Sequence, residues 1–160
     1  MNIFVLHNNP TKAAQMMCDK HVVKMILESN QMLSTVARKH GHNAPYRSTH
    51  SNHPCTLWAG ESNANWYWLV RHSRALCEEY TARYGRIHKS QAVTEWAEAL
   101  QIELTAQEQT PFRLAMPDKY KTNDPVESYR GYYIGEKSRI AKWKTGNIPN
   151  WWTRARSSVD

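Results

Sequence analysis

Apolar side chains recur three or four positions apart in several stretches of the chain, which is the spacing of one face of an α-helix. The first long stretch follows Asp19, a residue type that caps helix N-termini, and carries Val22, Ile26, Leu33 and Val36. This pattern predicts a long amphipathic helix whose apolar face packs on the core.

Capping and turn residues divide the remaining chain into further helices. Asn9 followed by Pro10 predicts a short helix before the long one. Gly85 is placed to end a helix in the left-handed conformation. Three later helices are expected over residues 61–84, from Ser90 through Leu104, and from Asp124 through about Ile140.

Three segments lack helical periodicity. Residues 40–56 and 105–124 contain two prolines each and few aliphatic side chains, so they are predicted to be loops. The apolar run 2–6 is too short to distinguish a strand from an apolar plug. The expected fold is mainly α: a compact helical bundle that forms a single domain over 1–160, with long irregular loops.

A polar row lies on the other side of the long helix. Lys20, Lys24, Glu28 and Gln31 are four, four and three residues apart, a spacing that usually marks a solvated face. With His21 beside them, the same positions bring a carboxylate, an imidazole and an ammonium together. That set suits general acid and base chemistry on an anionic substrate, which is the alternative interpretation of the row.

Histidine and cysteine recur in the loop at 40–56. His50, His53 and Cys55 could meet Cys18 and His21 in space, and these are ligand types that zinc accepts. Neither spacing is that of a standard zinc finger, so contacts within the loop or with phosphate are the main expectation. No metal ligand and no cofactor is assigned.

The charge balance points to a polyanionic partner. Lysine and arginine number 21 against 14 acidic residues, and the formal net charge is +7. The C-terminal quarter carries most of this excess, and residues 145–160 are expected to form a basic, aromatic tail. Seven Trp and eight Tyr accompany these charges. Flat rings beside basic side chains are typical of nucleic-acid binding.

Several protein classes are excluded by missing motifs. The chain contains no phosphate-binding glycine loop, no nucleophile-elbow serine and no dinucleotide fingerprint. No apolar run approaches the ~20 residues needed to cross a bilayer. Three irregularly spaced cysteines argue against a disulfide framework. We therefore expect a cytoplasmic monomer with no membrane partner.

Three stretches resemble the pyrimidine-dimer DNA glycosylase family, the small helical phage-type endonuclease V enzymes and their bacterial relatives. The resemblance covers roughly residues 1–90. The stretches are Lys24-Met-Ile-Leu-Glu28-Ser-Asn-Gln31-Met-Leu33, Asn52-His53-Pro54-Cys-Thr-Leu-Trp58, and the aromatic helix that ends Glu78-Glu79-Tyr80-Thr-Ala-Arg83-Tyr84-Gly85.

The resemblance implies an all-helical enzyme that bends duplex DNA, flips a base and cleaves the N-glycosidic bond. A β-elimination at the abasic site would follow in some members. In this interpretation Glu28 or His21 acts at the sugar ring or holds an attacking water, and Lys24 belongs to the same catalytic group. The pattern does not decide between the glutamate and the histidine.

The resemblance also implies an amine nucleophile. Phage-type members use the amine exposed when the initiator methionine is removed. Here residue 2 is Asn, which is too large for efficient removal, so the amine would be that of Met1. Lys20 or Lys24 is the alternative amine for a Schiff base.

Phosphate and strand contacts are expected from two parts of the chain. The predicted nucleic-acid-binding residues are Lys20, Arg47, His50, Asn52, His53, Arg130, Tyr132, Tyr133, Lys137 and Trp151. Two other functions remain open on the sequence alone. One is a non-catalytic nucleic-acid-binding accessory protein of a phage or mobile element, and the other is a metal-dependent nuclease or base-modification enzyme.

Overall fold

The computed structural model describes residues 1–145 and 147–157, and regular structure in these residues consists of helices without strands. The mainly α fold predicted from the sequence is therefore confirmed. The elements are α1 (Pro10–Met16), α2 (Asp19–Lys39), α3 (Pro54–Ala59), α4 (Asn63–Tyr84), α5 (Gln91–Ala99), the 3₁₀ turn η1 (Asp118–Tyr120), α6 (Pro125–Glu136) and α7 (Asn150–Ser157).

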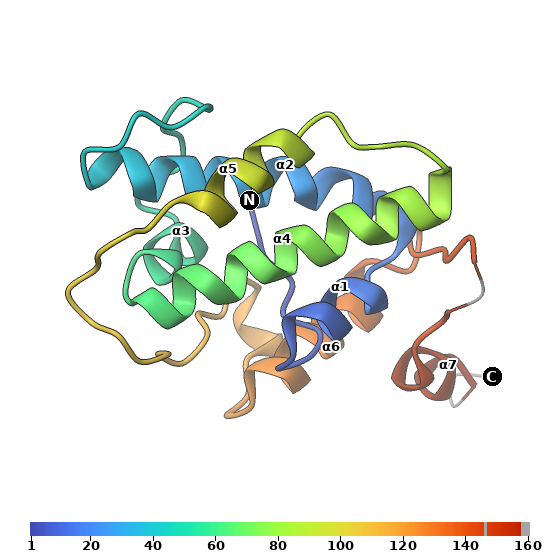
Figure 1. The fold of residues 1–160 in the computed structure, drawn as a ribbon. Coiled ribbons are helices and arrows are strands. Elements are labelled where there is room, and N and C mark those ends of the chain that lie inside the picture. Colours follow the sequence, from blue (N-terminus) through green and yellow to red (C-terminus); the bar gives the residue numbers. More distant parts are fainter. Residues whose placement is uncertain (146, 158–160) are drawn as a thin grey trace.

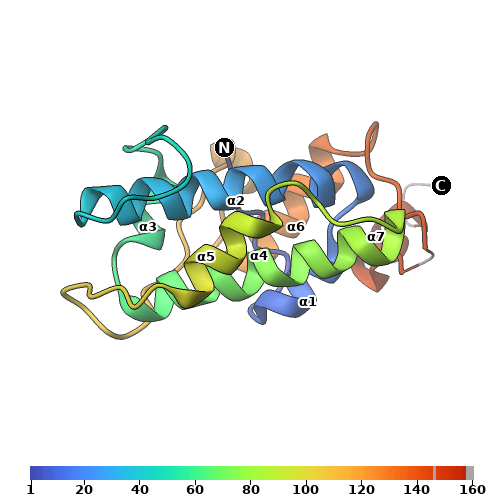
Figure 2. The same cartoon turned by 45° about the horizontal axis from the view of Figure 1, so that its top comes forward.

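Two long helices form the frame of the molecule. α2 and α4 lie side by side and run in opposite directions (Figures 1 and 2). α1 packs on α4, α3 packs on α2, and α5 contacts both long helices. The long connector after α5 returns past α3 to α6, which lies on the side of α1 in Figure 1. Tyr129 and Tyr133 of α6 are fully buried in the common core.

Local capping chemistry explains where several helices begin and end. The Asn9 side chain accepts hydrogen bonds from two backbone amides of the first turn of α1, and Asp124 does the same for α6. Gly85 ends α4 with a φ of 69°, a left-handed conformation that glycine adopts without a Cβ clash. These three ends agree with the sequence prediction.

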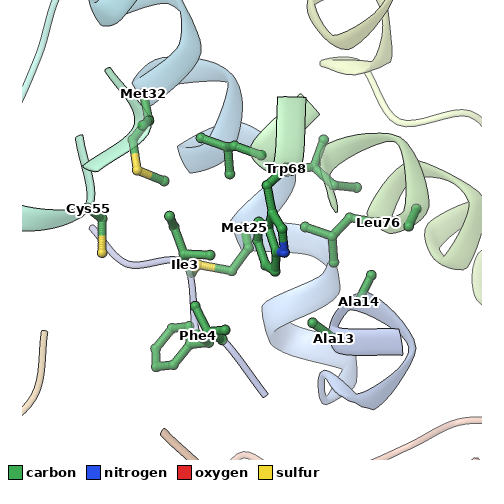
Figure 3. Packing of buried hydrophobic residues seen from close by; sticks show 14 of the residues in the cluster. Ile3, Phe4, Ala13, Ala14, Met25, Met32, Cys55, Trp68 and Leu76 are labelled. Atoms are coloured by element: carbon green, nitrogen blue, oxygen red, sulfur yellow. The ribbon is translucent and has the colours of Figure 1, made fainter. Parts of the chain in front are cut away.

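The first six residues form an irregular segment that runs through the centre of the fold. Residues 2–6 are all buried but form no strand, so the plug interpretation of this apolar run is the correct one. Figure 3 shows Ile3 and Phe4 on this segment among core side chains that include Met25 and Cys55. Phe4 has a φ of 54°, which is uncommon for a residue with a Cβ and bends the chain sharply.

Several predicted boundaries differ from the structure, and α3 begins at Pro54 inside the loop predicted over 40–56. α5 ends at Ala99, and Leu104 is instead buried in the connector. α6 ends at Glu136, so Ile140 lies outside it. Part of the predicted tail at 145–160 is the helix α7, while residues 146 and 158–160 lie outside the described residues. None of the described helices is both long enough and apolar enough to span a bilayer.

Arg83 ties the end of α4 to the junction between α1 and α2. Its guanidinium side chain is only 1% exposed and donates to the carboxylates of Asp19 and Glu79. It also donates to the backbone carbonyls of Met17 and Gln15. Because Asp19 is the first residue of α2, this network fixes the place where that helix begins.

Substitution of Arg83 by Ala should lower the free energy of unfolding by about 3 kcal/mol, because the partly buried carboxylates would lose their cation. Urea titration measures this change. The matched control is Arg74→Ala, whose ion pair with Glu98 has side chains 32% and 34% exposed. The Arg74→Ala substitution should lower the free energy of unfolding by about 0.5 kcal/mol. Equal losses in the two variants would contradict the proposed difference between them.

Candidate active site

The amino terminus of the chain lies against a buried carboxylate. The Met1 amine nitrogen is 3.1 Å from Oε1 of Glu28, whose side chain is 9% exposed. Among the described residues no other group donates to Oε1, so the Met1 ammonium is the partner of this buried oxygen. Lys24 Nζ lies 3.7 Å from the other oxygen, Oε2.

The Met1 side chain anchors this amine. The side chain is 2% exposed, whereas the residue as a whole is only partly buried, so its exposed atoms belong to the backbone around the amine. The methionine side chain packs against the core cluster. The amine is therefore fixed in place and still reachable from solvent.

A small pocket opens at this ion pair. It has a volume of about 160 Å³, which is the space of roughly five water molecules. Its walls come from the N-terminal segment, α2, and the end of α6. The lining residues are Met1, Asn2, Phe4, His21, Lys24, Met25, Glu28, Tyr132 and Lys137.

His21 is held as a neutral imidazole at the wall of this pocket. Its Nδ1 is 2.6 Å from the hydroxyl of Tyr133, and its ring stacks on Phe4 with centroids 4.3 Å apart. Burial, together with the nearby positive charges of Lys137 and Lys24, lowers the pKa of His21 from 6.5 to about 3. Nε2 is then the ring nitrogen available to a molecule in the pocket.

Two pocket residues come from the second half of the chain. Tyr132 lies beyond Phe4, with the two rings stacked at a centroid distance of 6.0 Å. Lys137 places its Nζ 4.9 Å from the centroid of the Tyr132 ring. The pocket therefore joins a carboxylate and an amine with two further cations, an arrangement that attracts an anionic substrate.

The loop that carries the Asn-His-Pro motif lies close to the same site. Nδ1 of His53 accepts a hydrogen bond from the backbone amide of Cys55 and so caps α3. The ring proton is therefore on Nε2, which makes that nitrogen a donor. Burial lowers the pKa of His53, the Met1 amine lowers it further, and Glu28 raises it. The motif and the ion pair thus lie within electrostatic range of each other.

A basic groove adjoins the pocket along α2. It has a volume of about 770 Å³, and its lining includes Lys24, Arg47 and Lys89 but no acidic residue. Val23 and Leu27 form an exposed apolar strip between these cations, at 37% and 41% exposure. An apolar floor with basic walls suits a nucleic-acid strand.

The polar row on α2 is a solvated face only in part, because Lys20 and Lys24 are exposed whereas Glu28 is buried. Glu28 is 7% exposed and His21 is 5% exposed, and both line the pocket with Lys24. Lys20 and Gln31 do not reach the pocket, although Gln31 lines the basic groove.

The other predicted contact residues separate into two groups. Arg47, His50 and Asn52 are exposed, as a nucleic-acid contact requires. A second group makes contacts within the protein. Arg130 donates to the carbonyl of Leu6 and lies over the ring of Trp151, which is partly buried.

Tyr133 was expected to face a bound strand, and its placement corrects that expectation. The residue is fully buried at 0% exposure, because α6 packs it against the start of α2. Its hydroxyl donates to Sγ of Cys18, accepts from the Cys18 amide and contacts His21. Tyr133 therefore orients the histidine from inside the core.

The five residues considered as metal ligands do not form one site. Cys18 and Cys55 are both buried, while His50 lies on the exposed loop. In residues 1–145 and 147–157, no group of three or more histidine, cysteine or acidic side chains is arranged to hold a metal ion.

Sequence reasoning missed two residues that shape the pocket. Phe4 stacks on His21, and the Asn2 side chain makes four hydrogen bonds that hold the N-terminal segment. The apolar run 2–6 indicated burial but gave no sign that its first residues reach the carboxylate. The proximity of the buried N-terminal segment to α2 depends on the tertiary fold, so the sequence pattern does not indicate it.

The comparisons with known proteins agree with this site. A family model described as pyrimidine dimer DNA glycosylase matches residues 1–92, which is more than half of the chain. The match contains Met1, His21, Lys24, Glu28 and the Asn-His-Pro motif. No curated protein and no solved structure gives a significant match.

The neutral state of His21 predicts a pH-dependent stability. Because its pKa is about 3 in the folded chain, against an ordinary value of 6.5, the unfolded chain binds a proton that the folded chain does not. The contribution of neutral His21 to the free energy of unfolding is complete above pH 6.5 and is lost as the pH falls toward 3. Between pH 7 and pH 5 the free energy of unfolding should fall by about 2 kcal/mol from this residue alone.

Urea titrations at pH 7 and pH 5 measure this loss, and His21→Asn should remove it while keeping a polar partner for Tyr133. His72, whose pKa burial lowers to about 4, remains in both proteins and contributes equally. The prediction is wrong if the two proteins lose the same stability on acidification.

Proposed function

Because this chain belongs to the pyrimidine dimer DNA glycosylase family, we propose that it is a DNA glycosylase with an associated strand-cleaving lyase step. The substrate is a nucleotide flipped out of duplex DNA, and the family description makes a pyrimidine photodimer the first lesion to test. The observation that carries the proposal is the Met1 amine, held 3.1 Å from Glu28 in a solvent-reachable pocket.

The Met1 amine suits the role of nucleophile better than Lys24. The Lys24 side chain is 69% exposed and reaches Glu28 at 3.7 Å, so its amine is loosely held. The Met1 side chain is buried and leaves its amine little freedom.

The proposed reaction begins when the Met1 ammonium loses a proton to solvent and the free amine nitrogen attacks C1′ of the flipped sugar. The new C–N bond forms as the glycosidic bond breaks, and the electron pair of that bond leaves with the base, which takes up a proton from solvent. The proton lost by the amine passes to Glu28. Opening of the C1′–O4′ bond, with that proton delivered to O4′, gives a Schiff base on Met1.

The lyase step uses the same carboxylate. Removal of a proton from C2′ of the imine by Glu28 expels the 3′ phosphate and cleaves the strand. Water then hydrolyses the imine, which returns the free amine. Neutral His21 positions this water through Nε2, because its Nδ1 is occupied by Tyr133.

The pocket and the groove support a flipped-base mode of binding. A volume of about 160 Å³ suits a sugar and its glycosidic nitrogen but excludes a base pair in its stack. The nucleotide must therefore leave the helix to reach the amine. Lys24, Arg47 and Lys89 in the basic groove then hold the flanking phosphates. A defined pocket next to a basic groove also favours an enzyme over a non-catalytic binding protein.

Borohydride should trap the protein on duplex DNA that carries an abasic site, because it reduces a Schiff base to a stable secondary amine. Mass spectrometry after trypsin locates the adduct. We expect it in the N-terminal peptide 1–12, which holds the Met1 amine and ends at Lys12. An adduct in a peptide that contains Lys20 or Lys24 would refute Met1 as nucleophile, and complete lack of trapping would refute the lyase step.

Substitution of Glu28 by Gln should lower the single-turnover rate of base release by about 10²- to 10⁴-fold, because the site loses its proton acceptor. The affinity for DNA should be retained, since the substitution removes a negative charge. Glu95→Gln is the matched control, an exposed carboxylate on α5. Quench-flow on photodimer-containing duplexes provides the rates. A Glu28→Gln protein as fast as the control would place the chemistry elsewhere.

A further inference from the structure

Beside the ion pair, the N-terminal segment contains a second set of polar contacts, the hydrogen bonds of the Asn2 side chain. Residues 2–6 run through the core without regular structure, so their backbone amides need partners other than a helix or a sheet. The side chain of Asn2, which is 8% exposed, supplies partners for two of these amides. Its Oδ1 accepts from the amide of Ile3 at 2.8 Å and from the amide of Phe4 at 3.0 Å.

The same side chain also binds a distant part of the chain. Nδ2 of Asn2 donates to the carbonyl of Ala115 at 2.8 Å, in the connector between α5 and α6. An asparagine is the residue that fits this combination. Aspartate has no donor for Ala115, and serine is too short to span both partners. Asn2 thus clamps the backbone directly next to Met1.

We propose that Asn2 is the positioning residue that sets the Met1 amine against Glu28. The chain leaves the Asn2 clamp with one residue remaining, so the direction of that residue is determined by the clamp on one side and the buried Met1 side chain on the other. The catalytic consequence of this inference rests on the function proposed above. The placement of the amine in the free protein does not depend on that function.

The size of Asn2 adds a second part to this role. Enzymes that remove initiator methionine require a small second residue, so asparagine keeps Met1 in the mature chain. Loss of Met1 would withdraw the amine by one Cα–Cα step, about 3.8 Å, from Glu28. It would also empty the place that the Met1 side chain fills in the core.

The test compares Asn2→Leu with Asn65→Leu in the full-length protein. Leucine at position 2 is large enough to retain Met1, which intact mass confirms. Asn65 is a matched control because it is fully buried and its side chain also holds the connector. It donates to the hydroxyl of Thr110 and accepts from the Thr110 amide. Both variants therefore lose comparable structural bonds.

The first measurement uses the free protein. Acetylation of the Met1 amine by a small N-hydroxysuccinimide ester is followed by peptide mapping, with Lys24 in the same molecule as internal reference. We expect Asn2→Leu to accelerate Met1 labelling severalfold, because the amine is released from Glu28, while Asn65→Leu leaves it unchanged. Equal Met1 labelling in the wild type and both variants would overturn the proposal.

The second measurement uses borohydride trapping on an abasic duplex. Asn2→Leu should lower the trapping rate by about tenfold or more at unchanged DNA affinity, because a misplaced nucleophile loses its alignment. Asn65→Leu should trap at the wild-type rate. If the wild type itself is never trapped, the proposed lyase step fails and labelling alone decides the role of Asn2.

A third variant covers the case in which Asn2→Leu does not fold. Asn2→Gln keeps the amide on a side chain one carbon longer and also retains Met1. It should change labelling and trapping in the same directions by smaller factors. Wild-type values for both measurements in a folded Asn2→Gln protein, with Met1 retained, would count against the clamp.

Discussion

The ion pair between the chain's own amino terminus and Glu28 is the constraint around which the structure is arranged. An ammonium can reach a carboxylate that is 9% exposed only if the residues behind it are buried as well. The first six residues accordingly run through the core, where their backbone polar groups need partners. Asn2 provides the partner for the amides of Ile3 and Phe4, and the bend at Phe4 turns the segment past His21.

This constraint explains why both halves of the chain contribute to one small pocket. α2 supplies Glu28 and His21, and the Arg83 network fixes the start of that helix against α4. α6 then closes the pocket with Tyr132, while Tyr133 on the same helix holds His21 from within the core. The family match ends at residue 92, so these α6 residues lie beyond the matched part of the chain.

The sequence predicted those features that depend on local chemistry. Helix periodicity and capping residues placed α1, α2, α4 and the start of α6, because these signals are read within a few residues. The polar row on α2 contained the carboxylate of the site, and His21 lies beside that row. The row could not show that Glu28 is buried, because the covering residues are distant in sequence. Tyr133 was misassigned for the same reason, since a tyrosine in a basic run is equally compatible with core and surface.

Phe4 of the N-terminal segment and Tyr132 of α6 stack on each other in the pocket lining, so two distant parts of the chain meet there. The groups proposed to react, Met1 and Glu28, lie in the matched N-terminal part, whereas Tyr132 and Lys137 of the pocket lining come from the second half of the chain. If a nucleotide enters this pocket as proposed, exchange of Tyr132 would change which nucleotide is admitted and leave the amine and its carboxylate in place.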